Sequence, residues 1–230
     1  MMYLYEMISI LMPIYNGVEF INDSVNSIKL QTYKDWELII GINGHPPNSE
    51  TYKKAKKYET KEEMENGNYK ETQRIRVLDM HEIKGKSEAL NKMMEFVKND
   101  WVALLDVDDV WLPQKLESQI PYMKEYDVIG TMCKYFGDMN IVPNIPVGDI
   151  SKFNFLRVNP IINSSCLVRR ELCYWDGNWD GVEDYDMWLR LRNNNHKFFN
   201  VGYIHVLHRI HNDSAFNSKG NNLNVNKLIK

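Results

Sequence analysis

The sequence has few cysteines, little net charge and no long apolar run, and each of these features argues against a class of protein. Its 230 residues include three cysteines, Cys133, Cys166 and Cys173, and no C-x-x-C pair. An odd number of widely spaced cysteines fits neither a disulfide framework nor a zinc site, so we expect free thiols in a reducing compartment. The net charge of −3 gives no general attraction to nucleic acid, and no nucleic-acid partner is expected.

The chain also lacks a run of the roughly 18 apolar residues that a transmembrane helix needs. Its N-terminus is apolar, but it has no basic segment, Glu6 interrupts it and Pro13 ends it, which does not fit an export signal. We therefore expect a cytoplasmic protein without a transmembrane segment, for which a peripheral membrane contact stays open. A composition of 43% hydrophobic and 26% charged residues suits a single globular domain over residues 1–230.

Apolar runs alternate with amphipathic segments in the first half of the chain. Four short apolar runs are expected to be strands: residues 8–15, 36–42, 76–80 and 101–105. Apolar residues between them recur at helical spacing, as at Leu90, Met93, Met94 and Val97. This alternation predicts an α/β fold, with a doubly wound, mostly parallel, Rossmann-like sheet and helices on both faces. Residues 50–72 are highly charged and are expected to form a solvated helix and a loop.

The second half of the sequence is less regular. Pro113 is placed to begin a helix that Pro121 would kink or shorten. Residues 128–135 and 165–169 are expected to be strands. Residues 212–230 are rich in Asn and Lys, which predicts a mobile tail.

An acidic run follows the fourth predicted strand. Residues 102–105 deliver Asp106, Asp108 and Asp109 to the carboxyl end of that strand, where open α/β sheets bind ligands. Carboxylates this close repel one another, and a bound cation relieves the repulsion. Mg²⁺ and Mn²⁺ accept carboxylate oxygens together with substrate phosphate, so the run fits a divalent-metal site. The alternative is an acidic loop that precedes a helix and is favoured by the helix dipole.

Eight segments occur in an informative order along the chain: Ser9–Gly17, Gln31–Tyr33, Trp36–Ile40, Gly85–Asn91, Leu105–Asp109, Pro113–Glu117, Glu183–Arg190 and Arg209–Ser214. Together they resemble glycosyltransferase family 2, over about residues 8–214. The resemblance implies the GT-A fold and an inverting transfer of a sugar from a nucleotide diphosphate sugar to an acceptor hydroxyl of a glycan, lipid or protein. It further implies a nucleotide-sugar-binding half over about residues 1–109 and an acceptor-binding, catalytic half over about 110–211.

The resemblance assigns catalytic and metal-binding roles to residues of this chain. Asp106 and Asp108 would hold Mn²⁺ or Mg²⁺, which stabilises the diphosphate leaving group, and His211 is a candidate third ligand. Asp184 matches the general base of the family, which takes the proton from the acceptor, and Glu183 beside it would orient the acceptor.

The resemblance also implies a donor site. Pro13 and Tyr15 end the first predicted strand, where the family cradles the nucleotide, and Asp106 would contact the donor as well. Lys86 begins a predicted helix, whose N-terminus suits phosphate, and Arg209 would reach the diphosphate. Asn43 stands where the family usually has an acidic pair that contacts the base or the ribose. Because an amide can still hydrogen-bond a base, the base stays open, and a UDP-sugar is expected since uracil is the commonest base in the family.

Several of these residues have a plainer interpretation. Asp186 and Arg190 lie four residues apart on a predicted helix, which favours a surface ion pair. Trp188 is expected to be a core residue, whereas Trp111 could stack on a sugar because it follows the acidic run. His208 is expected to be structural.

Two other functions remain open at this point. A nucleotidyltransferase uses a similar sheet and acidic metal ligands, but it would usually carry a glycine-rich phosphate loop after its first strand, where this chain has Asn16-Gly17. The second alternative is a sugar- or nucleotide-binding module without catalysis, because a fold does not guarantee an activity.

Overall fold

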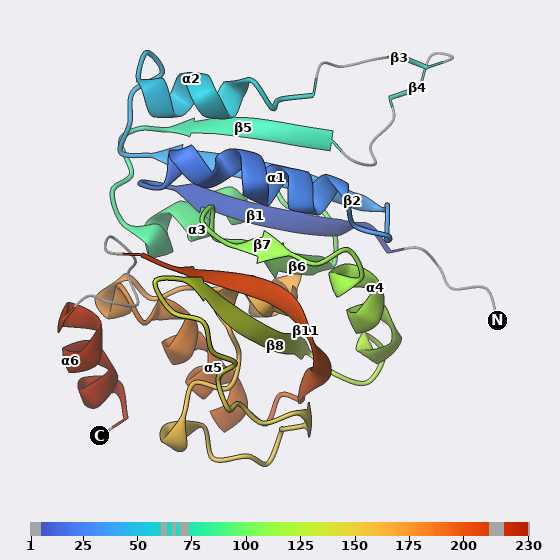
Figure 1. Ribbon diagram of the computed structural model, residues 1–230, viewed down its shortest axis with the longest axis vertical. Coiled ribbons are helices and arrows are strands. Elements are labelled where there is room, and N and C mark those ends of the chain that lie inside the picture. The colour runs from blue at the N-terminus through green and yellow to red at the C-terminus, as the bar shows by residue number, and fades with distance from the viewer. Residues whose placement is uncertain (1–5, 61–63, 66–67, 70–73, 212–218, 230) are drawn as a thin grey trace.

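The structure is a computed structural model, and it describes residues 6–60, 64–65, 68–69, 74–211 and 219–229. Its main sheet has the strand order β5-β2-β1-β6-β10-β8-β11-β7, and β9 pairs with β11 (Figure 1). The strands are β1 (Ile8–Ile14), β2 (Trp36–Asn43), β5 (Arg74–Met80), β6 (Trp101–Leu104), β7 (Val110–Trp111), β8 (Val128–Gly137), β9 (Gly148–Asp149), β10 (Leu167–Arg169) and β11 (Phe198–Ile210). A separate pair joins β3 (Met64–Glu65) to β4 (Asn68–Tyr69).

The first half of the sheet is parallel, as predicted. β5, β2, β1 and β6 pair side by side in parallel register, so their carboxyl ends meet at one edge. Alternate residues of β1 enter two different hydrophobic cores, since successive strand side chains point to opposite faces. Ile10 joins the core that contains Val25 of helix α1 (Ile21–Lys29), and Leu11 joins the core that contains Leu90 of α3 (Lys86–Met94). These two helices therefore cover opposite faces of the sheet.

The second half is mixed. β10 is antiparallel to both β6 and β8, β8 and β11 are parallel, and β7 and β9 are antiparallel to β11. The helix predicted after Pro113 is short: α4 (Lys115–Gln119) gives way to a 3₁₀ turn at Ile120–Tyr122, which holds Pro121. Helix α5 (Glu183–Asn193) packs Met187 and Trp188 into the core that contains Phe198 of β11. The remaining 3₁₀ turns are Val18–Phe20, Phe155–Arg157, Asn163–Ser165, Arg170–Leu172 and Gly177–Trp179.

Two charged or polar segments differ from expectation. The region 50–72 contains helix α2 (Glu50–Lys56), which Ser49 caps, but also the β3–β4 pair; residues 61–63, 66–67 and 70–72 lie outside the described part. The mobile tail predicted for 212–230 is wrong for residues 219–228, which form helix α6 (Lys219–Leu228). Val225 and Leu228 pack against the hydrophobic core that contains residues of α5, and this apolar contact holds α6 against the domain. Residues 212–218 and 230 lie outside the described part.

No helix within the described ranges has the length and apolar character required to cross a membrane.

Gln31 ties the parallel half of the fold to the segment that follows the acidic run. Its side chain is fully buried just beyond the end of α1. The amide nitrogen donates to the carbonyl oxygen of Leu112 at 2.8 Å, and the amide oxygen accepts from the backbone nitrogen of Leu116 at 3.1 Å. A single side chain thus satisfies two buried backbone groups that no helix or strand ladder pairs.

The Gln31→Ala substitution should lower the free energy of unfolding by about 1–3 kcal/mol, because it leaves the backbone nitrogen of Leu116 without a partner and removes one of the two hydrogen bonds to the carbonyl oxygen of Leu112. Urea denaturation measures the loss. Gln114→Ala is the matched control, since Gln114 is exposed, and should change stability by less than about 0.5 kcal/mol. Equal effects of the two substitutions would show that the bridge contributes nothing.

Candidate active site

A cleft of about 1490 Å³ opens where the carboxyl ends of β1, β2 and β6 meet the starts of α3 and α5. Nine of the ten predicted site residues line it: Pro13, Tyr15, Asn43, Lys86, Asp106, Asp108, Glu183, Asp184 and His211. The tenth, Arg209, does not. The fold therefore collects segments that are up to 198 residues apart in sequence, from Pro13 to His211, at one edge of the sheet.

The residues expected to hold the nucleotide form one wall of the cleft. Tyr15 is half exposed, and its ring lies against Gly44, where a Cβ atom would stand 2.4 Å from the ring. Gly44 also has a φ of +72°, so a glycine is required there for two reasons. His45 hydrogen-bonds the carbonyl oxygen of Tyr15 and packs near its ring. Asn43 lies at the end of β2, almost fully buried but bordering the cleft.

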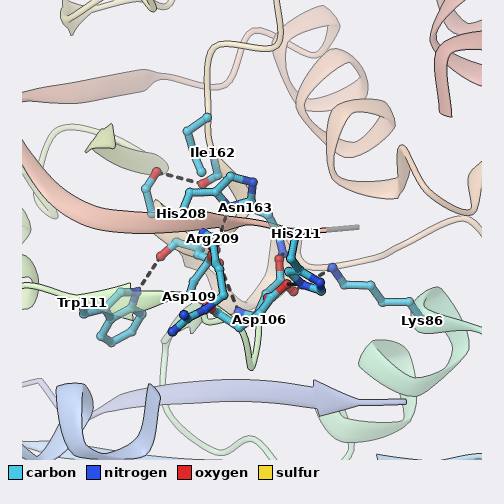
Figure 2. Close-up of polar contacts among 12 residues, drawn as sticks. Lys86, Asp106, Asp109, Trp111, Ile162, Asn163, His208, Arg209 and His211 are labelled. Carbon is cyan, nitrogen blue, oxygen red and sulfur yellow. Dashed lines mark hydrogen bonds and ion pairs between the residues drawn. The ribbon is translucent and has the colours of Figure 1, made fainter. Parts of the chain in front are cut away.

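Asp106 is held from three sides. The ammonium of Lys86 lies 2.7 Å from Oδ1, the amide of Asn163 donates to Oδ2 at 3.0 Å, and the backbone nitrogen of Asp106 donates to the hydroxyl of Ser164 at 3.1 Å (Figure 2). Burial opposes ionisation of Asp106, but Lys86 and Asn163 outweigh it and lower the pKa of the carboxyl below its usual value. Asp106 is thus an ionised carboxylate with both oxygens engaged.

Asp108 is less well compensated. Its Oδ2 lies 3.1 Å from Nε2 of His211, but burial and the charges of Asp109 and Asp106 raise its pKa. Two carboxylates and an imidazole are a ligand set that suits Mn²⁺ or Mg²⁺, and the excess negative charge favours a cation. In the described part of the chain, however, no group of three or more His, Cys, Asp or Glu side chains is arranged to hold a metal ion. The residues fit a metal in kind, but they are not preassembled around one.

Asp109 plays a different part from its two neighbours. It is fully buried, and its oxygens accept from Nδ1 of His208 at 2.9 Å and from the backbone nitrogen of Arg209 at 2.8 Å. Burial alone would lower the pKa of His208, but Asp109 and the other acidic residues raise it to about 9. Asp109 therefore connects the acidic loop, residues 106–109, to β11. His208, expected to be structural, also supplies positive charge at the rim of the cleft.

Arg209 does not line the cleft. Its guanidinium lies 4.4 Å from the rings of both Phe20 and Phe136, and it donates to the carbonyl oxygen of Asp108 and to the carboxylate of Asp23, each at 2.9 Å. In this arrangement Arg209 stabilises the acidic loop through its hydrogen bond to the carbonyl oxygen of Asp108.

Glu183 and Asp184 begin α5, and they also line the cleft. Glu183 is buried; one oxygen accepts from the backbone nitrogen of Gly181 at 2.7 Å and the other lies 3.5 Å from the ammonium of Lys86. Asp184 accepts from the amide of Asn159 at 3.2 Å. Burial and the charge of Glu183 raise the pKa of Asp184 to about 6.

The structure decides three of the plainer interpretations. Trp188 is a core residue, as predicted. Asp186 pairs with Arg190 at 2.7 Å, but the predicted surface position of this ion pair is wrong for Asp186, which is buried. Stacking of Trp111 on a sugar is wrong. The indole is 2% exposed, its nitrogen donates to the carbonyl oxygen of Ser164, and the ammonium of Lys115 lies 3.9 Å over its ring.

Sequence inspection missed three residues that position the acidic groups: Asn159, Asn163 and Ser164. They lie in irregular backbone between β9 and β10, and each contacts a residue at least 25 positions away. The polar run Asn163-Ser164-Ser165 between apolar residues is the one local signal that could have drawn attention to them.

Comparison with known proteins bears directly on this cleft. The sequence profile of Glycosyl transferase family 2 matches residues 9–166, which is more than half of the chain. The chain belongs to glycosyltransferase family 2. Among curated proteins, this glycosyltransferase is similar to the Escherichia coli O-antigen biosynthesis glycosyltransferase WbnJ, with 29% identity over 91% of this chain and 82% of WbnJ. It is also similar to the Escherichia coli β-1,3-glucosyltransferase WfgD, with 28% identity over 93% of this chain and 81% of WfgD.

Solved structures agree on the fold. The glycosyltransferase superposes on S. aureus TarS 1-349 in complex with UDP-GlcNAc with a TM-score of 0.73 and 15% identity, over 97% of this chain and 65% of that one. It superposes on the mannosyltransferase PcManGT from Pyrobaculum calidifontis with a TM-score of 0.64 and 13% identity, over 91% and 59% of the two chains. The chain thus spans about two thirds or less of these structures and has the GT-A fold that its sequence predicts.

Arg209→Ala should lower the free energy of unfolding by about 1–3 kcal/mol, because it removes two ring contacts and the hydrogen bonds to Asp23 and Asp108. Thermal or urea denaturation measures this. Arg157→Ala is the control, since Arg157 is exposed and forms no ion pair with a described residue. A loss of nucleotide affinity at unchanged stability would instead support the diphosphate contact predicted for Arg209.

Proposed function

We propose that this glycosyltransferase is a metal-dependent inverting enzyme that moves a sugar from a UDP-sugar to an acceptor hydroxyl. The observation that carries the proposal is the meeting of two acidic groups from different halves of the chain in one cleft. Asp106 and Asp108 come from the end of β6, and Asp184 comes from the start of α5. The donor would lie over residues 1–109 and the acceptor against residues 110–211.

Asp184 is the proposed general base. Its carboxylate takes the proton of the acceptor hydroxyl as the acceptor oxygen bonds to the anomeric carbon, while the bond from that carbon to the diphosphate breaks and the diphosphate leaves with the electron pair. A pKa of about 6 leaves Asp184 ionised at neutral pH yet more basic than an ordinary aspartate. Asn159 orients the carboxylate by its hydrogen bond, and Glu183 raises its basicity.

Asp106, Asp108 and His211 are the residues that would hold the divalent cation. A bound cation would neutralise charge on the diphosphate leaving group. PcManGT was solved with GDP-Man and Mn²⁺, which supports a metal site in this fold. TarS was solved with UDP and with UDP-GlcNAc, and the amide of Asn43 has both a donor and an acceptor for a base such as uracil.

Several apolar residues and an exposed cation line part of the cleft. Leu156, Val158, Val225 and Ile229 line it, and Arg157 lies among them. The full name of the relative WfgD includes α-D-GlcNAc-diphosphoundecaprenol, a sugar linked through a diphosphate to undecaprenol. An acceptor sugar that carries an anionic group and an apolar chain would match this wall, so we propose an acceptor of that kind.

A thermal-shift panel of UDP, GDP, CDP and ADP, each with and without Mn²⁺, tests the donor site. UDP with Mn²⁺ should raise the melting temperature most, because UDP is the nucleotide of the proposed donor. A ligand at a hundredfold excess over its Kd stabilises the native state by about 2.7 kcal/mol. Asp108→Ala should lose the part of the shift that depends on Mn²⁺. A Mn²⁺-dependent shift in the variant as large as that of the wild type would contradict the metal assignment.

Asp184→Asn should lower kcat by at least about a hundredfold, because the amide cannot accept the acceptor proton. UDP affinity should stay within about threefold of the wild-type value, since the base does not contact the nucleotide. Transfer is measured by the release of UDP in the presence of acceptor. Asp186→Asn, on the same helix but paired with Arg190, is the control for helix integrity. Unchanged turnover would remove Asp184 as base, and nucleotide binding without any turnover in the wild type would favour a non-catalytic module.

The pH dependence of kcat/KM should rise with pH and level off above about 6, because Asp184 is active only when deprotonated and its pKa is raised to about 6. Below that value the rate should fall about tenfold per pH unit. In the Asn159→Ala variant the acid limb of the profile should move to higher pH. The hydrogen bond from Asn159 lowers the pKa of Asp184, and the variant lacks that bond. A limb that stays near pH 4 in both proteins would contradict a base with a raised pKa.

A further inference from the structure

Lys86 occupies an unusual position for a lysine. It is the first residue of α3, where the helix dipole disfavours positive charge, and Gly85 before it offers no side-chain cap. The side chain nevertheless turns inward from the start of α3 toward the acidic loop (Figure 2). An attraction stronger than the dipole must hold it there.

Two carboxylates provide that attraction. The ammonium of Lys86 lies 2.7 Å from Oδ1 of Asp106 and 3.5 Å from Oε1 of Glu183. Glu183 is 6% exposed, Asp106 is 22% exposed and Lys86 is 37% exposed at the side chain, so this contact is screened less than a fully exposed ion pair. Lys86 therefore links a proposed metal ligand at the end of β6 to the residue beside the proposed base.

This contact gives the second oxygen of Asp106 a partner. With Asn163 on Oδ2 and Lys86 on Oδ1, both oxygens of the carboxylate already have charged or polar partners. Asp108 faces His211 instead. A divalent cation would need an oxygen of Asp106. Oδ1 is paired with the ammonium of Lys86, and Oδ2 is bonded to the neutral amide of Asn163. A cation at Oδ1 would therefore replace one positive charge with another.

We propose that Lys86 is an internal counter-ion that competes with the divalent cation for Asp106. Without metal, its ammonium holds Asp106 and Glu183 together against their mutual repulsion. When the cation binds, Lys86 leaves Asp106 and turns to the donor diphosphate, which offers it a new anionic partner. Metal and donor then bind cooperatively, because the donor removes the cost of displacing Lys86. This proposal rests on the metal site of the proposed function.

The test is Mn²⁺ affinity, measured by titration calorimetry and by the electron paramagnetic resonance of free Mn²⁺, with no nucleotide present. Lys86→Met should bind Mn²⁺ about tenfold more tightly than the wild type or better, a usual size for such coupling. Lys86→Arg keeps the charge and the ion pair and should stay within about threefold of the wild type.

Lys84→Met is the matched control for a general change of charge. Lys84 lines the same cleft two residues away, but it is exposed and forms no ion pair with a described residue. Its loss should alter Mn²⁺ affinity by about twofold or less. Equal tightening in the Lys84 and Lys86 variants would mean that long-range charge acts rather than competition at Asp106, and would overturn the proposal.

Repeating the titration with UDP separates this proposal from the function on which it rests. UDP should raise Mn²⁺ affinity more in the wild type than in Lys86→Met, because only the wild type has a lysine to displace. In metal-free buffer, Lys86→Met should also melt at a lower temperature than the wild type. Mn²⁺ binding of equal strength in the wild type and Lys86→Met would overturn the role of Lys86 and leave the proposed function intact. No Mn²⁺ binding to either protein, even with UDP, would overturn both.

Discussion

The concentration of negative charge at one end of the sheet is the constraint on which the site depends. The acidic run and the start of α5 bring five carboxylates to the cleft or beside it: Asp106, Asp108, Asp109, Glu183 and Asp184. Each must be ionised, protonated or paired, because burial makes an unpaired charge costly. Lys86 of α3 and His208 of β11 supply the cations that pair with Asp106, Glu183 and Asp109. Charge compensation therefore also joins the two halves of the chain.

The compensation is uneven, and the unevenness separates the roles of the carboxylates. Asp109 is buried and fully bonded, which suits an anchor between the acidic loop and β11. Asp106 is ionised and shared between Lys86 and Asn163, whereas Asp108 and Asp184 have raised pKa values. The two raised groups are those whose charge is least balanced within the protein, and they are the ones that a cation and an acceptor proton would relieve.

A buried polar scaffold keeps the acidic loop in place. The hydroxyl of Ser164 accepts from the backbone of Asp106, and its carbonyl oxygen accepts from the indole of Trp111. On the other side of that segment, the hydroxyl of Ser27 accepts from the backbone nitrogen of Trp111 at 3.1 Å. Trp111 is therefore part of the buried hydrogen-bond network that positions the acidic loop, and its indole does not contact a sugar.

The sequence by itself determined the parallel half of the sheet, the family and most of the cleft. Short, mostly apolar runs such as 36–42 that end in turn residues are typical of strands buried on both faces, and the acidic run that follows 101–105 is then expected at their carboxyl edge. These are local patterns, so they can be found without knowing the fold. Tertiary structure alone decided the direction of Arg209, the burial of Trp111, the docking of α6 and the pairing of Lys86 with Asp106 and Glu183. Each of these depends on residues tens to hundreds of positions apart, and a side chain's partner across that distance is set by how the elements pack, which no local pattern records.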